Sequence, residues 1–86
     1  MIRICEVNAM ELGDEIRKLR QRCFLSQEAF AKSLNVSVST INRWESGKSR
    51  PTLSVMRDIK EFCRNNEIDF STIEDIWLNH PQERDK

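Results

Sequence analysis

The sequence predicts an all-α domain of five short helices, and three observations lead to this fold class. Apolar residues recur at the three- and four-residue spacing of amphipathic helices in five separate stretches. Residues that favour helix N-caps precede these stretches, and asparagine, glycine or proline separates several of them. With 86 residues, 38% hydrophobic and 33% charged, the chain has the size and composition of one soluble globular domain.

The first predicted helix covers residues 8–23. Asn8, followed three residues later by Glu11, fits a capping pair, in which each side chain bonds a free backbone N–H group of the first turn. One apolar stripe then continues along the helix at helical spacing, formed by Leu12, Ile16, Leu19 and Cys23.

Two very short helices follow, over residues 27–34 and 37–46. Ser26 and Ser37 are favourable N-cap residues for them. The expected helix ends are Asn35 and Gly47, because both residue types tolerate the left-handed conformation. The side chains expected to face inward are Phe30, Ala31, Leu34, Ile41 and Trp44. Two such short helices across a tight turn fit a helix-turn-helix unit better than an antiparallel bundle.

Two further helices complete the predicted domain. Thr52 caps a fourth helix, whose apolar positions are Leu53, Met56, Ile59, Phe62 and Cys63. The segment 71–74, Ser-Thr-Ile-Glu, fits a capping box and opens a short fifth helix with Ile73, Ile76 and Trp77. We therefore expect a domain over residues 10–78, an N-terminal arm at 1–9 and a frayed polar tail at 79–86.

The charges are unevenly distributed along the chain, although they sum to zero. Residues 15–50 carry eight cations and three anions, which gives a local charge of +5. Residues 1–14 carry one cation and three anions, and residues 51–86 carry five cations and eight anions. The middle of the chain therefore suits a surface that faces phosphates, although an ordinary mixed-charge surface is an alternative.

The stretch from Leu25 to Pro51 fits the pattern L-S-Q-x-x-[LF]-A, a short turn, and S-x-x-[TS]-[IV]-x-x-[WYLIF]-E-x-G-K-x-x-P. In this pattern it resembles the phage-repressor (Cro/XRE) family of helix-turn-helix proteins. The resemblance implies a five-helix, lambda-repressor-like domain that binds double-stranded DNA with its third helix in the major groove. The sequence departs from the family at Cys23-Phe24, where a glycine is common.

The outward face of helix 37–46 carries the residues that we expect to read bases. At about 100° per residue, with Ile41 inward, Ser39, Asn42 and Arg43 point outward and Val38 lies at the boundary. Arginine can bond guanine, asparagine can bond adenine, and valine can contact a thymine methyl group. We predict base contacts from Val38, Ser39, Asn42 and Arg43; the alternative is a merely solvated helix face.

Polar residues around this helix are candidates for phosphate contacts. Gln27 matches the family position that binds a phosphate beside a helix N-terminus. The full set of expected phosphate contacts is Gln27, Ser37, Ser46, Lys48 and Arg50. Glu45 falls on the inward side of the same helix, and a buried charge needs a partner. Arg20, at the matching family position of the first helix, is predicted to form a structural ion pair with it.

Several other classes of function do not fit this composition. The three cysteines are widely spaced without a C-x-x-C pair, and the single histidine is His80, so we expect no metal and no cofactor. With two glycines and no phosphate-cradling loop, the chain is not expected to be an enzyme. It shows neither a signal peptide nor an apolar run of the roughly 20 residues that span a bilayer. We expect no membrane association and a cytoplasmic protein with reduced thiols.

Three functions remain open from the sequence. The first is a transcriptional regulator that acts as a repressor. We expect it to bind a two-fold-symmetric operator as a homodimer, because one recognition helix reads few bases. Apolar residues that could form the dimer interface, or merely close the core, are Ile68, Phe70, Ile73, Ile76 and Trp77. The second is an antitoxin that regulates its own operator and binds a toxin partner. The third is a protein-interaction module that retains the fold without binding DNA.

Overall fold

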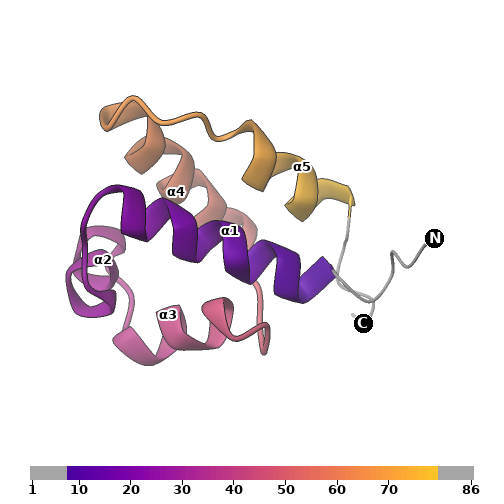
Figure 1. The fold of residues 1–86 in the computed structure, drawn as a ribbon, viewed down its shortest axis with the longest axis horizontal. Coiled ribbons are helices and arrows are strands. Elements are labelled where there is room, and N and C mark those ends of the chain that lie inside the picture. Colours follow the sequence, from indigo (N-terminus) through magenta and orange to yellow (C-terminus); the bar gives the residue numbers. More distant parts are fainter. Residues whose placement is uncertain (1–7, 80–86) are drawn as a thin grey trace.

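A computed structural model of the chain describes residues 8–79, and it confirms the all-α fold class (Figure 1). The helices of this range are α1 (Asn8–Arg22), α2 (Gln27–Leu34), α3 (Val38–Glu45), α4 (Leu53–Asn65) and α5 (Ser71–Asn79). None of them is both long and apolar enough to cross a membrane. The arm predicted at 1–9 and the tail predicted at 79–86 lie almost entirely outside the described residues.

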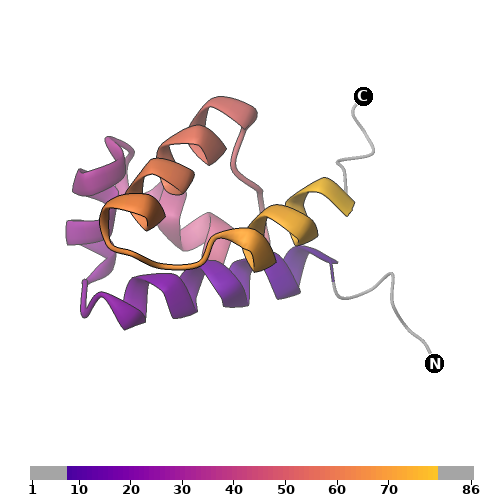
Figure 2. The same ribbon diagram turned by 90° about the horizontal axis from the view of Figure 1, so that it is seen from above.

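Helix α1 is the central element of the fold. It packs against α3 on one side and α5 on the other, while α2 contacts both α3 and α4 (Figures 1 and 2). As a result α3 lies at one border of the molecule, supported from behind by α1 and α2.

The predicted apolar stripes meet in one core. Its buried side chains are Leu12, Ile16, Leu19, Phe30, Ala31, Leu34, Ile41, Trp44, Met56, Ile59, Cys63 and Ile73. Phe30 and Phe62 add an edge-to-face ring contact with centroids 5.4 Å apart. Cys63 is fully buried, whereas Cys23 lies just beyond α1 and is only half-buried.

Most of the predicted helix caps are present. The side chains of Ser26, Ser37 and Thr52 each accept a hydrogen bond from the backbone N–H three residues later, as N-caps do. Asn35 ends α2 in the left-handed conformation, with φ of 59°. Gly47 follows α3 with φ of 80°, a value that glycine adopts without strain.

Two helix ends differ from the prediction. Helix α1 ends at Arg22, one residue before the predicted end. Phe24 takes the left-handed conformation, with φ of 57°, at the site where related proteins commonly have a glycine. Phe24 as a whole is 95% exposed. The capping box predicted at 71–74 is wrong, because the Ser71 hydroxyl donates to the Asp69 carboxylate at 2.9 Å instead of capping the helix. Asp69 also accepts the Ser71 backbone N–H at 3.0 Å and so caps α5 from two residues upstream.

Candidate nucleic-acid interface

Helices α2 and α3 form a compact unit joined by a tight turn. The turn is closed by hydrogen bonds from the backbone N–H groups of Asn35 and Val36 back to α2, at 3.2 and 2.9 Å. Ala31, whose carbonyl accepts the Val36 N–H in this turn, is buried, and its small side chain takes up little room between packed helices. The unit therefore holds α3 in one fixed orientation against α2.

Helix α3 has a buried face and an exposed face. Ile41, Trp44 and Glu45 are buried, with at most 3% of each residue exposed. The four predicted base-reading residues, Val38, Ser39, Asn42 and Arg43, are all exposed, and Val38 keeps 42% of its surface in solvent. The structure thus brings these four side chains together on one accessible surface, which we call the reading face.

Three of the predicted phosphate-contacting residues lie at the ends of α3. Ser37 is its N-cap, and the Ser37 oxygen accepts the Thr40 N–H at 3.2 Å. Ser46 is its C-cap, and the Ser46 hydroxyl donates to the Arg43 carbonyl at 3.3 Å. Lys48 follows on the loop and is exposed. All three residues lie at an end of α3 or just beyond it.

The other two predicted phosphate-contacting residues bond within the protein. The Gln27 side-chain amide donates to Oε1 of Glu45 at 3.1 Å. The Arg50 guanidinium lies over the indole of Trp77, with Cζ 4.5 Å from the ring centroid. Arg50 also donates from Nη2 to the Trp77 carbonyl at 2.9 Å.

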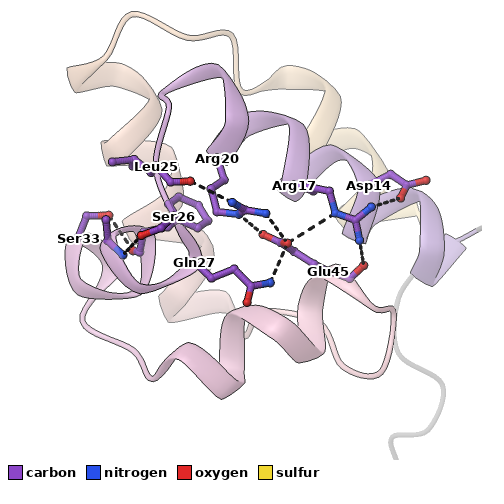
Figure 3. Close-up of polar contacts among 10 residues, drawn as sticks. Asp14, Arg17, Arg20, Leu25, Ser26, Gln27, Ser33 and Glu45 are labelled. Carbon is purple, nitrogen blue, oxygen red and sulfur yellow. Dashed lines mark hydrogen bonds and ion pairs between the residues drawn. The ribbon is translucent and has the colours of Figure 1, made fainter.

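Glu45 is the centre of a polar network between α1, α2 and α3 (Figure 3). The structure pairs it with Arg20 through two hydrogen bonds, from Nε at 2.7 Å and from Nη2 at 3.0 Å. The remaining terminal nitrogen of Arg20 donates to the Leu25 carbonyl at 2.9 Å. One arginine therefore connects α3 to both α1 and the segment that leads into α2.

Arg17 is a second cation at the same carboxylate, and the sequence analysis did not identify it. Its Nε is 3.6 Å from Oε1 of Glu45, and its Nη2 donates to the Glu45 backbone carbonyl at 3.3 Å. The signal was available, because Arg17 and Arg20 lie one helical turn apart on the same side of α1. Gln27 could not be found this way, since its reach to Glu45 depends on how α2 crosses α3.

The network keeps Glu45 ionised although it is buried. Burial alone would raise its pKa, but the hydrogen bonds from Arg20 and Gln27 and the charges of Arg20 and Arg17 hold the pKa below the ordinary value of 4.5. The hydrogen bond to Glu45 in turn raises the pKa of Arg20 above its ordinary value. A charge is thereby maintained directly behind the reading face.

Gly13 allows α1 to approach the end of α3 closely. A Cβ atom at this position would lie 2.5 Å from the Trp44 carbonyl oxygen and 3.0 Å from that of Glu45. Both contacts are with backbone, which cannot rotate away as a side chain can. The absence of a side chain at Gly13 therefore sets the distance between α1 and α3.

The comparison with protein families decides the identity of this unit. A family model described as "Helix-turn-helix" matches residues 16–69, which include α2, the turn and α3. The chain belongs to the helix-turn-helix family of Cro/XRE type. Membership of this family supports a role in DNA-binding transcription regulation.

A curated relative of this helix-turn-helix chain points in the same direction. The "HTH-type transcriptional activator BcrR" of Enterococcus faecalis is 38% identical over 53 residues. The match covers 62% of the chain described here and 26% of the relative. The chain thus spans only about a quarter of that relative's length.

The helix-turn-helix domain holds no cluster suited to a metal among its described residues, where no three His, Cys, Asp or Glu side chains gather. Burial, together with the nearby Cys23 and Asp69, raises the pKa of the Cys63 thiol to about 11. At neutral pH Cys63 is therefore a protonated apolar side chain of the core.

Proposed function

We propose that the protein binds double-stranded DNA sequence-specifically, as a transcription regulator whose helix α3 enters the major groove. The observation that carries this proposal is the division of α3 into two faces. The four side chains of its reading face are exposed, while the opposite face is fixed to α1 and α2 through Glu45, Trp44 and Ile41. A rigidly held helix with an exposed polar face is what major-groove recognition requires.

Each residue of the reading face offers chemistry for base recognition. Arg43 can present two donors to O6 and N7 of guanine, and Asn42 can bond both N6 and N7 of adenine. Val38 offers an apolar surface to a thymine methyl group, and the Ser39 hydroxyl can donate to or accept from either pair. We assign base reading to these four residues.

The groups that border the reading face suit contacts with phosphate. Lys48 contributes a positive charge, and Ser37 and Ser46 contribute hydroxyl groups at the two ends of α3. Gln27 is the first residue of α2, where free backbone N–H groups favour an anion. The surplus of cations over residues 15–50 adds attraction that does not depend on DNA sequence.

We further propose a homodimer on a two-fold-symmetric operator, with α5 in the interface. Ile73 belongs to the core, whereas Ile68, Phe70, Ile76 and Trp77 are only partly buried against it. Leu78 extends this apolar surface and is 58% exposed. Dimers of this kind place two α3 helices in half-sites about 34–36 Å apart, which doubles the number of bases read.

We propose that the dimer represses transcription in the cytoplasm by occupying a site that overlaps a promoter. Repression needs only tight occupancy of DNA, which the helix-turn-helix unit supplies. A reporter gene under the bound promoter tests the direction. Lower expression with the protein present supports repression, and higher expression would assign it the role in the name of its enterococcal relative.

Sequencing of genomic fragments that co-purify with the protein tests sequence-specific binding. A shared palindromic motif among the fragments is the expected result. Binding to that motif should weaken steeply with salt, with a linear fall of log affinity against log salt concentration. Fragments without a common motif, or affinity that does not change with salt, would overturn the proposal.

A further inference from the structure

The loop between α3 and α4, residues 46–52, contains three predicted phosphate-contacting residues, Ser46, Lys48 and Arg50. Backbone hydrogen bonds attach the start of this loop to α3. Gly47 turns the chain with φ of 80°. The backbone N–H groups of Lys48 and Ser49 then both donate to the Arg43 carbonyl, at 2.9 and 3.4 Å. The first half of the loop is therefore an extension of the end of α3.

The second half of the loop is bound to α5, beside which it passes (Figure 2). The indole N–H of Trp77 donates to the Pro51 carbonyl at 2.8 Å. In the opposite direction, Arg50 donates to the Trp77 carbonyl at 2.9 Å, with its guanidinium over the indole ring. Two crossed hydrogen bonds and a cation–π contact thus fasten residues 50 and 51 to a single residue of α5.

The environment of Arg50 is that of a packed side chain. Burial lowers its pKa below the ordinary value, since the guanidinium has lost part of its water. Pro51, the next residue, is buried as well. The backbone carbonyl and the indole ring of Trp77 replace part of the lost water as partners.

We propose that Arg50 and Trp77 form a clamp that positions loop 46–52, and that Arg50 supports DNA binding through this clamp rather than as a phosphate ligand. The Lys48 backbone is bonded to the end of α3, and the clamp holds the chain two residues later, so the two attachments together set where the Lys48 charge lies relative to α3. The expected effect of the clamp on DNA affinity rests on the proposed function. The clamp itself rests only on the contacts between residues 50–51 and Trp77.

Salt-dependent DNA binding separates a clamp from a phosphate contact. Arg50→Ala and Trp77→Leu should each weaken operator binding by about three- to fivefold, the value of one cation–π contact at a partly exposed site. The double variant should lose little more than either single variant, because both break the same clamp. The salt slope should stay unchanged in Arg50→Ala and fall by about one unit in Lys48→Ala.

Arg64→Ala is the matched control for charge, because it removes one exposed cation from the far end of α4. It should leave operator affinity within twofold of the unchanged protein. The clamp is overturned if Arg50→Ala lowers the salt slope by about one unit while Trp77→Leu binds the operator normally. In that case Arg50 is a phosphate ligand.

Hydrogen exchange of the Lys48 and Ser49 amides tests the clamp without DNA. Both should exchange several-fold faster in Arg50→Ala and Trp77→Leu, while amides in the centre of α1 keep their rates. Trp77→Phe replaces Trp77→Leu in this test if the leucine variant does not fold. The phenylalanine keeps an aromatic ring and loses the indole donor, so its loop amides should exchange faster than in the unchanged protein, but by less than in Arg50→Ala. Unchanged loop exchange in Arg50→Ala and Trp77→Phe would contradict the clamp, even if the protein binds DNA as proposed.

Discussion

Glu45 is a buried charge of α3 whose partners come from two other helices, α1 and α2. A buried ion pair contributes little net stability compared with apolar packing, because desolvation of both charges offsets their attraction. Its effect is specific, however, since any displacement of α3 from α1 would leave the carboxylate without its arginines. The network therefore favours one orientation of the reading face over neighbouring ones.

Removal of either main partner should destabilise the fold strongly. Arg20→Met leaves the buried carboxylate with only Arg17 and Gln27, and Glu45→Gln leaves Arg20 without its anion. Since the side chains of Arg20 and Glu45 are only 14% and 3% exposed, each change should lower the free energy of unfolding by about 3–5 kcal/mol. Equilibrium unfolding in denaturant measures this change in the free energy of unfolding. Melting temperatures equal to that of the unchanged protein would show that the pair adds nothing.

The same carboxylate should make stability depend on pH in acid. The pKa of Glu45 is lower in the folded state than its ordinary value of 4.5. Its contribution is therefore complete above that value and is lost as the pH falls through the lower, folded pKa. Unfolding free energies measured from pH 6 downward should fall more steeply for the unchanged protein than for Glu45→Gln. Parallel curves would contradict the assignment, since Asp69 and the other carboxylates are common to both proteins.

Arg43 and Lys48 should differ in what they contribute to DNA binding. Arg43→Ala should cost about 1–3 kcal/mol on the operator, and one base position should lose its preference. Lys48→Ala should weaken operator and random DNA equally. Binding of both variants to operators mutated at each position distinguishes the two roles. If Arg43→Ala weakens all sequences equally, base reading falls to Val38, Ser39 and Asn42.

At the scale of the elements, sequence patterns predicted each helix and the capping residues of three of them. These features depend on local chemistry, such as a serine before an apolar stripe. The errors occurred where local signals were ambiguous: Asp69 and Ser71 can both cap a helix, and only the path of the preceding loop decides between them. Arg50 illustrates the same limit in the site, because its spacing from Trp77 in sequence gives no sign of their contact.

Gly13 should be intolerant of any side chain, although alanine is the better helix former. The added Cβ would press on the backbone of Trp44 and Glu45 and push α3 away from α1. Gly13→Ala should therefore lose about 1–3 kcal/mol of unfolding free energy, as other overpacked sites do, and should weaken operator binding as well. Gln21→Ala, at an exposed position of the same helix, is the control. A stabilised Gly13→Ala would mean that the crossing of the two helices can relax.

The sequence combines a cationic middle segment with two end segments that both carry a surplus of anions. Residues 15–50 supply the surface that would face DNA, whereas the surplus of anions after residue 50 lies in the part of the chain that contains α4 and α5. On the proposed DNA target, such a distribution would orient the molecule in the field of the phosphates, although its net charge is zero. In the proposed complex it leaves the surface of α5 for a second copy of the chain.

The dimer should depend on the exposed apolar surface of α5. Leu78→Glu places a charge at a position that is 58% exposed in the protomer and buried in the proposed dimer. Sedimentation should then show a monomer at concentrations where the unchanged protein is a dimer. Phe24→Glu, at an even more exposed apolar residue far from α5 in sequence, should remain dimeric. An unchanged protein that sediments as a monomer both free and on DNA would remove the dimer from the proposal.

The separation of α3 into a buried face and an exposed face affects how the DNA targets of such proteins can change in evolution. Val38, Ser39, Asn42 and Arg43 are exposed, and their side chains lie outside the core and the Glu45 network. If these residues read bases as proposed, substitutions at these positions can exchange one target site for another while the scaffold keeps its stability. Retargeting of the protein by design should need changes on this surface alone, and the same freedom would let duplicated copies of one gene acquire separate sets of promoters.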